Sequence, residues 1–448
     1  MKYYVRTYGC QMNVADSDEM GRHLQARGLT PTEDPEEASV LLVNTCTVRQ
    51  HAEDRAFSEI GRLKKWKARQ PGRKLVLTGC AAERTKEYLE NRFPYIDLIV
   101  GARSIGEFGA AVDSLLGRRD TDEDLEYAMP VTSDKVSAFV TIMRGCNYNC
   151  SYCIVPFVRG RESYHPLDQI LTEVRDRVNE GAREIILLGQ TVNSYHREGS
   201  RGRDTDFADL LENVARVDGV ERIRFMSPHP YYMTDRVIQA LADVPEVCEC
   251  VHLPLQSGSD AMLRKMQRNY TRGEYLTLVE KMRTAMPAMT ISTDVILGFP
   301  GETAADFRET LSMIEEAQFD WGFIFKYSTR EGTPAAAWQA CPDALIEERH
   351  QECLSVFERV AQRRRARWAG TQQEVLIEAG NIGRTRTNFK VLVDGKVVPG
   401  ELIRVAITNA DRPTLTGSAI TNHSPGGPDV HIAFSNFRPQ EHPTGSTC

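Results

Sequence analysis

Three cysteines within one short stretch carry the clearest chemical signal in the sequence. Cys146, Cys150 and Cys153 lie in MRGCNYNCSYCIVP, and the next cysteine along the chain is Cys248. A structural zinc ion takes four ligands, and ferredoxin clusters are bound by four cysteines. Three thiolates at CxxxCxxC spacing therefore favour a 4Fe–4S cluster with one iron left open for another ligand.

A second set of cysteines follows three separate apolar runs. Cys10, Cys46 and Cys80 end the runs YVRTYGC, LLVNTC and LVLTGC. If the runs are parallel strands, their carboxyl ends share one edge of a sheet, where ligands bind. Gly9 and Gly79 would let the backbone approach a cluster closely. Ordinary buried thiols are the alternative, but three strands ending in Cys are an uncommon coincidence.

Length and composition limit the class of protein. A chain of 448 residues predicts about three domains. No apolar run reaches the roughly 18 residues of a membrane helix, and MKYYVRTYGC does not resemble a secretory signal, so we expect a cytoplasmic protein without a membrane anchor. Eleven cysteines in that compartment indicate metal binding or catalysis rather than disulfides. The net charge of -7 argues against nonspecific coating of nucleic acid.

Elements that would position the first three cysteines fill the first hundred residues. Strands are expected at 2–10, 39–46, 74–80 and 96–101, with helices near 15–27, 48–69 and 83–92. This alternation is typical of an open parallel α/β sheet. A charged stretch at 118–126 is interpreted as a linker.

The remaining chain shows two further patterns. Six strand–helix units predict a partly or fully closed (β/α) barrel over about 136–335, with strands in 138–145, 184–190, 222–227, 250–256, 290–300 and 321–328. After a helix near 343–368, short alternating runs predict a small antiparallel β-barrel. The tail from about 422 is rich in Pro, Gly, Ser and His, a composition typical of disorder.

CxxxCxxC after the first barrel strand resembles the signature of radical S-adenosylmethionine enzymes, in which the open iron binds the methionine part of the cofactor. LLGQTVNSY and DVILGFPGET are similar to further motifs of these enzymes. The resemblance implies that cofactor-binding residues occur around the barrel mouth, and we assign this role to Tyr152, Gly189, Gln190, Gln256, Ser257 and Asp294. His252 is a weaker candidate than Gln256 and Ser257.

Six motifs in order make the whole chain similar to the methylthiotransferases. They are TYGCQMNVADSD, VNTCTVRQHAEDRAF, GCAAER, CIVPFVRGRE, HLPLQSGSD and KYSTREGTPAA. TYGCQMN resembles the MiaB-type branch, which modifies isopentenyl-adenosine in tRNA. The resemblance implies methylthiolation of carbon 2 of that base, with one S-adenosylmethionine as methyl donor and another as radical source, and sulfur held at the cluster of Cys10, Cys46 and Cys80. Many relatives carry an arginine where this chain has Ser163, Tyr164 and His165.

The same resemblance divides the chain into an α/β domain (1–117), a radical core (132–366), an RNA-binding TRAM domain (369–432) and a disordered tail (433–448). It implies two 4Fe–4S clusters, a tRNA anticodon loop as substrate and a flavodoxin-like or ferredoxin-like electron donor. We expect a monomer. Arg384, Arg386 and Lys390 in GRTRTNFKVLV are candidate RNA contacts. The basic runs at 62–74 and 363–367 bind phosphate or are solvated helix faces.

Other functions remain open at this point. A different modified adenosine, or a residue of a ribosomal protein, would use the same machinery. A non-catalytic iron–sulfur electron carrier would use the same cysteines without needing the barrel motifs, and a zinc-binding RNA module would need neither cluster. The remaining cysteines are interpreted as packing or unassigned residues, namely Cys248, Cys250, Cys341, Cys353 and Cys448.

Overall fold

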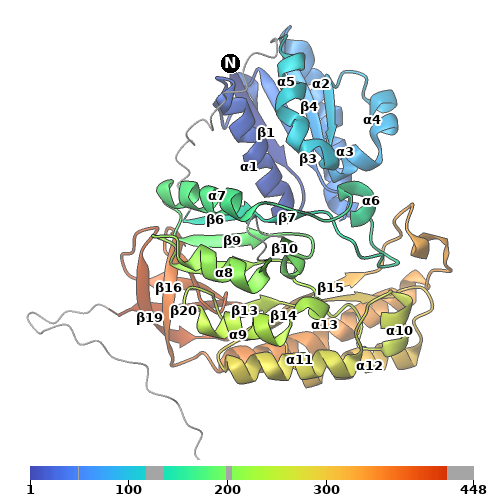
Figure 1. Cartoon of the computed structure of the whole chain (residues 1–448). Coiled ribbons are helices and arrows are strands. Elements are labelled where there is room, and N and C mark those ends of the chain that lie inside the picture. The colour runs from blue at the N-terminus through green and yellow to red at the C-terminus, as the bar shows by residue number, and fades with distance from the viewer. Residues whose placement is uncertain (49, 118–135, 198–203, 421–448) are drawn as a thin grey trace, which may run out of the picture.

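The computed structural model describes residues 1–48, 50–117, 136–197 and 204–420. The expected linker at 118–126 and the tail after 422 lie outside these residues. In Figure 1 the first hundred residues stand above a layer of parallel strands, and the last strands form a separate small barrel beside that layer.

The first part is a five-stranded parallel sheet in the order β2-β1-β3-β4-β5. Alternate residues of its central strand serve two cores, with Leu41 and Val43 facing one and Val40 and Leu42 the other. Helices on both faces explain why every residue of β3 is buried. The strands are β1 (Lys2–Thr7), β2 (Thr30–Pro31), β3 (Val40–Thr45), β4 (Lys74–Gly79) and β5 (Leu98–Gly101), and the helices are α1 (Gln11–Ala26), α2 (Gln50–Arg69), α3 (Cys80–Arg84), α4 (Lys86–Arg92) and α5 (Phe108–Leu115).

Helix α1 begins four residues before the expected position near 15. The start is set by Asn13, whose side-chain oxygen accepts a hydrogen bond from the backbone N–H of Cys10 at 3.4 Å. An amide in the first turn can satisfy a free N–H in this way, so the helix starts directly after the cysteine.

Six parallel strands form the central part, in two sheets of order β6-β9-β12 and β13-β14-β15. The sheets are joined where Ile223 N–H donates to Glu246 O (2.7 Å) and Cys248 N–H donates to Ile223 O (3.0 Å). No ladder joins β6 to β15 within the described ranges, so the barrel is partial. The strands are β6 (Ser137–Thr141), β9 (Glu184–Leu188), β12 (Arg222–Phe225), β13 (Cys250–His252), β14 (Thr290–Leu297) and β15 (Trp321–Lys326).

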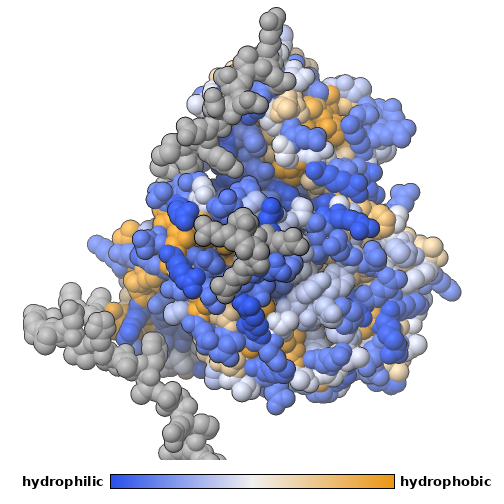
Figure 2. Space-filling view, viewed as in Figure 1, coloured by the Kyte–Doolittle hydropathy of each residue, from blue (hydrophilic) through white to orange (hydrophobic). Residues whose placement is uncertain are grey.

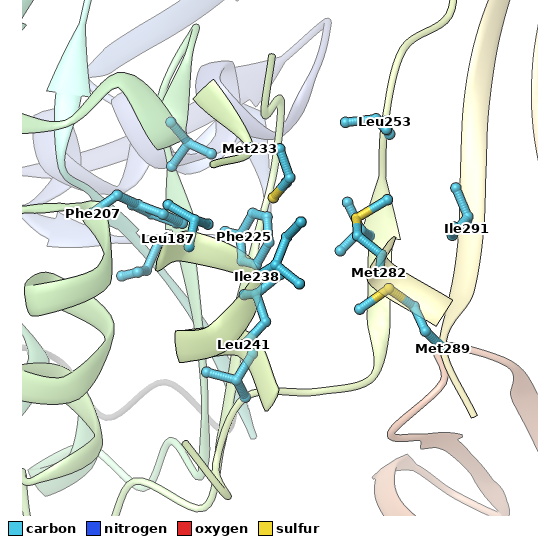
Figure 3. Packing of buried hydrophobic residues seen from close by; sticks show 14 of the residues in the cluster. Leu187, Phe207, Phe225, Met233, Ile238, Leu241, Leu253, Met282, Met289 and Ile291 are labelled. Atoms are coloured by element: carbon cyan, nitrogen blue, oxygen red, sulfur yellow. The ribbon is translucent and has the colours of Figure 1, made fainter. Parts of the chain in front are cut away.

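Helices cover the outside of this partial barrel (Figure 1). Their apolar faces and the strands share one core, part of which Figure 3 shows: Phe207 and Leu187 lie beside Phe225, and Met282 and Met289 lie near Ile291. The helices are α6 (Val155–Arg159), α7 (Leu167–Asn179), α8 (Phe207–Ala215), α9 (Asp235–Asp243), α10 (Asp260–Lys265), α11 (Arg272–Ala285), α12 (Ala304–Ala317) and α13 (Asp343–Ala366).

The last part is a closed barrel in the order β16-β17-β18-β20-β19. Four of its pairs are antiparallel, as expected, whereas β18 and β20 run parallel. Alternate apolar residues such as Val391 and Val393 fill its interior. The strands are β16 (Gln372–Ala379), β17 (Ile382–Thr385), β18 (Lys390–Asp394), β19 (Leu402–Asn409) and β20 (Thr414–Ala419).

Two buried arginines of β12 fasten this small barrel to the central part. Arg222 of β12 is fully buried, and its Nη1 donates to the carbonyl of Arg384 at 2.7 Å. Arg224 donates through Nε to Glu184 at 2.7 Å and through Nη2 to the carbonyl of Thr385 at 2.7 Å. The two barrels are therefore held by charged hydrogen bonds that are screened from water.

Much of the charge in the two basic runs is neutralised inside the molecule. The buried carboxylate of Asp320 accepts from Arg364 Nε at 3.2 Å and from Arg367 Nη2 at 3.3 Å. In the first run Lys67 pairs with Asp97 and Arg69 pairs with Glu36. Intramolecular pairing thus accounts for these four cations without RNA.

The surface is mainly hydrophilic on the face shown in Figure 2, where hydrophobic residues form separate small patches. No helix within the described residues is long and apolar enough to cross a membrane.

Replacing Asp320 with Ala should lower the free energy of unfolding by about 2–3 kcal/mol, because it removes a fully buried carboxylate and leaves the partly buried charges of Arg364 and Arg367 uncompensated. Glu347→Ala is the matched control: its carboxylate pairs with Lys326, but the glutamate side chain is 53% exposed against 0% for Asp320. The control should cost less than about 1 kcal/mol. Urea unfolding monitored by circular dichroism measures both, and equal costs would contradict the structural role of Asp320.

Candidate active site

The structure brings Cys10, Cys46 and Cys80 together at the carboxyl edge of the first sheet. They follow β1, β3 and β4, and a Cβ atom placed on Gly9 would lie only 2.7 Å from the Cβ of Cys46. Burial raises the pKa of the Cys80 thiol to about 12, with further contributions from Cys46 and Cys10 nearby. Three thiols from distant positions therefore share one site, which we call the first trio.

A pair of buried amides fixes the backbone beneath the first trio. Asn13 Nδ2 donates to Asn44 Oδ1 (3.0 Å) and to Thr45 O (3.1 Å), and Asn44 Nδ2 donates back to Asn13 O (2.8 Å). Neither side chain is exposed. Buried polar groups that satisfy one another in this way specify a single arrangement, here of the segments that carry Cys10 and Cys46.

Gly79 permits a close approach, but to the neighbouring strand rather than to an open site. It has φ of +99°, and a Cβ there would lie 2.2 Å from the carbonyl oxygen of Thr45. Only glycine combines that conformation with that spacing. The glycine before Cys80 thus sets the position of the cysteine by allowing β3 and β4 to pack.

Cys146, Cys150 and Cys153 form the second trio, in the loop between β7 (Met143–Arg144) and α6. Cys153 N–H donates to the carbonyl of Cys150 at 3.0 Å, and Cys146 Sγ lies 3.3 Å from Thr191 Oγ1. Burial raises the pKa of Cys153 to about 12, and the neighbouring thiols of Cys150 and Cys146 raise it further.

The first three expected cofactor residues pack around the second trio. Tyr152 lies in an apolar cluster and meets Phe299 edge to face at 6.3 Å. Gln190 accepts from the N–H of Gly145, so it holds the cysteine loop in place. Gly189 has no room for a side chain, because a Cβ would lie 2.5 Å from Cγ of Met143.

The other three expected cofactor residues differ in what their side chains contact. Gln256 has φ of +70°, and its Oε1 is buried without a hydrogen-bond partner in the described part of the chain. Asp294 pairs with His252 at 3.2 Å. Ser257 instead lies 3.4 Å from Thr310 of α12, oxygen to oxygen, so its hydroxyl already has a partner there. Gln256 therefore offers a free acceptor, whereas Ser257 does not.

Two features near the second trio were not foreseen. Arg268 is half-buried, and its Nη1 lies 3.5 Å from Cys150 Sγ. Tyr148, between the first two cysteines of the motif, stacks on His229 with ring centroids 4.2 Å apart. Burial, with a smaller contribution from Arg268, lowers the pKa of His229 to about 2, so the ring is neutral. Neither position stands out in the sequence, since a lone arginine or aromatic residue has many ordinary roles.

The three expected RNA contacts are placed differently from one another. Lys390 is exposed at the start of β18. Arg384 pairs with Glu378 at 2.6 Å within the same small barrel. Arg386 pairs with Glu249 of the central part at 2.8 Å. Of the three, Lys390 alone has no acidic partner within the described part of the chain, and the RNA-binding assignment stays a prediction.

The donor set at each trio suits an iron–sulfur cluster better than a single ion. Among residues 1–48, 50–117, 136–197 and 204–420, no three His, Cys, Asp or Glu side chains are arranged to hold one metal ion. In a 4Fe–4S cluster each thiolate binds a different iron, so the sulfurs need not converge on one point. Three thiols with no fourth protein ligand fit a cluster with one open iron.

The two trios are tied to one another through one carboxylate. Asp16 of α1 is fully buried and accepts from Arg144 Nη1 at 2.6 Å and from Arg159 Nη2 at 2.8 Å. Arg144 precedes Cys146 by two residues, and Arg159 ends the helix that follows Cys153. Burial alone would raise the pKa of Asp16, but Arg159 and Arg144 hold it below its usual value, so the carboxylate is charged.

Parallel strands in a partial barrel, with a CxxxCxxC loop after the first of them, define a radical S-adenosylmethionine protein. The model of the Radical SAM superfamily matches residues 140–314, and the model described as uncharacterized protein family UPF0004 matches residues 2–101. Three curated relatives are each named tRNA-2-methylthio-N(6)-dimethylallyladenosine synthase, and the chain belongs to this family.

These relatives match almost the whole chain. The one from Clostridium botulinum (strain Loch Maree / Type A3) is 39% identical over 94% of this chain and 97% of its own. The one from Sulfurihydrogenibium sp. (strain YO3AOP1) is 40% identical over 94% and 99%. The one from Pasteurella multocida (strain Pm70) is 38% identical over 94% and 92%.

Solved structures share the fold at low sequence identity. The radical S-adenosylmethionine methyltransferase TsrM from Kitasatospora setae superposes with a TM-score of 0.56 at 13% identity, covering 75% of this chain and 77% of that one. The cobalamin-dependent S-adenosylmethionine radical enzyme OxsB gives 0.51 at 10% identity, covering 80% and 56%. The radical S-adenosylmethionine fold expected from the cysteine motif is confirmed.

Gly79→Ala should destabilise the first part of the protein by several kcal/mol, because it adds a clash with Thr45 to an unfavourable positive φ. Gly72→Ala is the control, since Gly72 has φ of +89° with no atom within 4 Å of the added Cβ. The control should cost about 1–2 kcal/mol. Thermal unfolding of both variants measures the difference; equal costs would show that the packing of β3 on β4 does not require glycine.

Proposed function

We propose that this protein adds a methylthio group to carbon 2 of N6-dimethylallyladenosine, also called isopentenyl-adenosine, in the anticodon loop of tRNA. The names of the relatives give the reaction and the base. The observation that carries the proposal is the pair of three-thiol sites in one chain. The second trio alone would be enough for radical formation. The presence of the first trio as well gives sulfur a separate site.

Each trio is assigned a separate task. Cys146, Cys150 and Cys153 would hold the 4Fe–4S cluster at which S-adenosylmethionine binds, and the first trio would hold a second 4Fe–4S cluster for sulfur. When bound at the second trio, S-adenosylmethionine and its cluster supply the radical that can break the aromatic C–H bond, which no side-chain acid or base could do.

The protein's own residues would place the cofactor and exclude water. Gln256 Oε1 is a buried acceptor without a partner in the described residues, so it is available to an amino or hydroxyl group. Gln190 holds the Gly145 N–H and thereby the shape of the cysteine loop. The stacked Tyr148 and His229 rings, 4.2 Å apart, form a rigid wall beside the second trio.

The target base would enter the barrel mouth after leaving the loop stack. An unpaired nucleotide can be extruded at lower cost than a duplex base. Tyr231 is 59% exposed and Phe323 is 51% exposed, so both rings are available to stack on the base or contact its apolar dimethylallyl group.

The organisation of the protein follows from these roles. We propose domains at 1–117, 132–366 and 369–432, with the last binding RNA and 433–448 a tail. The electron would come from a flavodoxin-like or ferredoxin-like donor, and we propose a monomer working in the cytoplasm, where tRNA is found.

Two cysteine variants separate the tasks of the trios. Cys150→Ala should reduce formation of 5′-deoxyadenosine at least about 100-fold, because a cluster ligand is lost. Cys46→Ala should still form 5′-deoxyadenosine but yield no methylthiolated base. Anaerobic assays with reductant, S-adenosylmethionine and tRNA, followed by mass spectrometry of the digested nucleosides, measure both products.

Cys353→Ala is the control for these variants, because Cys353 is fully buried in α13 and belongs to neither trio. It should retain both activities. Methylthiolated product from Cys46→Ala at the wild-type rate would contradict the role of the first trio. Absence of methylthio-dimethylallyladenosine with a wild-type enzyme that forms 5′-deoxyadenosine on tRNA would contradict the choice of substrate.

Lys390→Ala should weaken tRNA binding about 3- to 10-fold and lower the slope of log affinity against log salt by about 1, as expected for loss of one phosphate contact. Lys396→Ala is the matched control, since Lys396 is also exposed in the same small barrel but lies beyond the end of β18. Fluorescence anisotropy at several salt concentrations measures both. Equal effects would argue against a localised contact at Lys390.

A further inference from the structure

Arg159 has a feature that its pairing with Asp16 leaves unexplained. Its side chain is 4% exposed, and Nη2 donates to Asp16 at 2.8 Å. The other terminal nitrogen, Nη1, is buried and has no hydrogen-bond partner in the described part of the chain. A buried guanidinium N–H without an acceptor is costly, so the position is expected to have a purpose.

The surroundings of Arg159 include the first trio. Helix α6, which ends at Arg159, packs on α3, the helix that begins at Cys80. Ile154 and Val158 share a buried apolar cluster with Cys80. Burial alone would lower the pKa of Arg159, but Asp16 and, to a smaller extent, the nearby thiols of Cys80 and Cys10 raise it above its usual value. A cation from the radical core thus lies beside the thiols of the first domain.

Resting on the proposed function, we propose that Arg159 binds the anionic sulfur carried at the first trio, with its Nη1 N–H groups donating to that sulfur. A hydrogen bond from a cation to an anionic acceptor is among the stronger hydrogen bonds in proteins. Arg159 is then a positioning residue. It orients the sulfur that is to be transferred and partly neutralises the negative charge on that sulfur.

The pairing with Asp16 suits this role. Asp16 holds one end of the planar guanidinium and so directs the fork, which a lysine ammonium could not do. Arg144 shares the same carboxylate, but both of its terminal nitrogens have acidic partners: Nη1 donates to Asp16 and Nη2 to Glu19, both at 2.6 Å. Arg144 therefore provides a matched comparison within one ion network.

The test uses the full chain with Cys146, Cys150 and Cys153 all replaced by Ala, so that only the first trio can bind a cluster. After anaerobic reconstitution, sodium methanethiolate is titrated while the electron paramagnetic resonance spectrum of the reduced cluster is followed. Arg159→Gln should weaken binding of methanethiolate about 10- to 100-fold. Arg159→Lys should weaken it less, and Arg144→Lys should leave it within about twofold of the background chain.

The outcomes separate this inference from the function on which it rests. If the background chain itself forms no cluster, the proposed function fails. If the cluster forms and Arg159→Gln binds methanethiolate like the background chain, the role of Arg159 is refuted. Equal losses in Arg159→Gln and Arg144→Lys would also refute it, because the effect would then belong to the Asp16 network.

A second measurement covers the case in which Arg159→Gln does not bind iron. The chain that lacks the three cysteines of the second trio is labelled with 15N in its arginines, and electron–nuclear double resonance is recorded on the reduced first-trio cluster with methanethiolate bound. We expect a coupling from an arginine nitrogen that is absent in Arg159→Lys. A spectrum with no arginine coupling, or one that persists unchanged in Arg159→Lys, would overturn the inference.

Discussion

One buried carboxylate fixes the relation between the two halves of the candidate site. Asp16 lies on α1, beside the first sheet, and it binds one arginine upstream of the second trio and one downstream of it. Removing Asp16 would leave two arginine side chains in a poorly hydrated place, at a cost of several kcal/mol. The first sheet and the segments that flank the second trio are therefore held together at this point.

Both trios provide fewer ligands than the four irons of a cluster. Each trio supplies three thiols, and each rests on polar groups that hold the backbone rather than on a fourth ligand. Asn13 and Asn44 serve the first trio, while Gln190 and Thr191 serve the second. The proposed function gives the open position at the second trio to S-adenosylmethionine and that at the first trio to sulfur, and in both places these polar groups would keep the cysteine segments in position.

Local patterns predicted most of the fold. Strands β1, β3 and β4 and the six barrel strands were recognisable because apolar runs bounded by turns specify buried strands. The grouping of Cys10, Cys46 and Cys80 followed from the parallel sheet alone. The parallel pairing of β18 with β20 was not visible, since an alternating run has the same appearance in either direction.

Ion pairs between residues far apart in the chain could not be predicted from the sequence. The arginines at the end of α13 form a basic run that could bind phosphate, yet Arg364 pairs with Asp320, which lies 44 positions away. Arg386 finds Glu249 across 137 positions, and the Asp16–Arg159 contact spans 143. Partners of this kind are decided by the packing of whole domains, so a charge run alone cannot tell a solvated face from an internal ion pair.

Whether both trios bind a cluster is measured by the iron content of the whole chain. After anaerobic reconstitution and removal of loosely bound metal, the account predicts about eight iron and eight inorganic sulfide atoms per chain, with Mössbauer parameters of 4Fe–4S clusters. A value of about four, or zinc in place of iron, would contradict it.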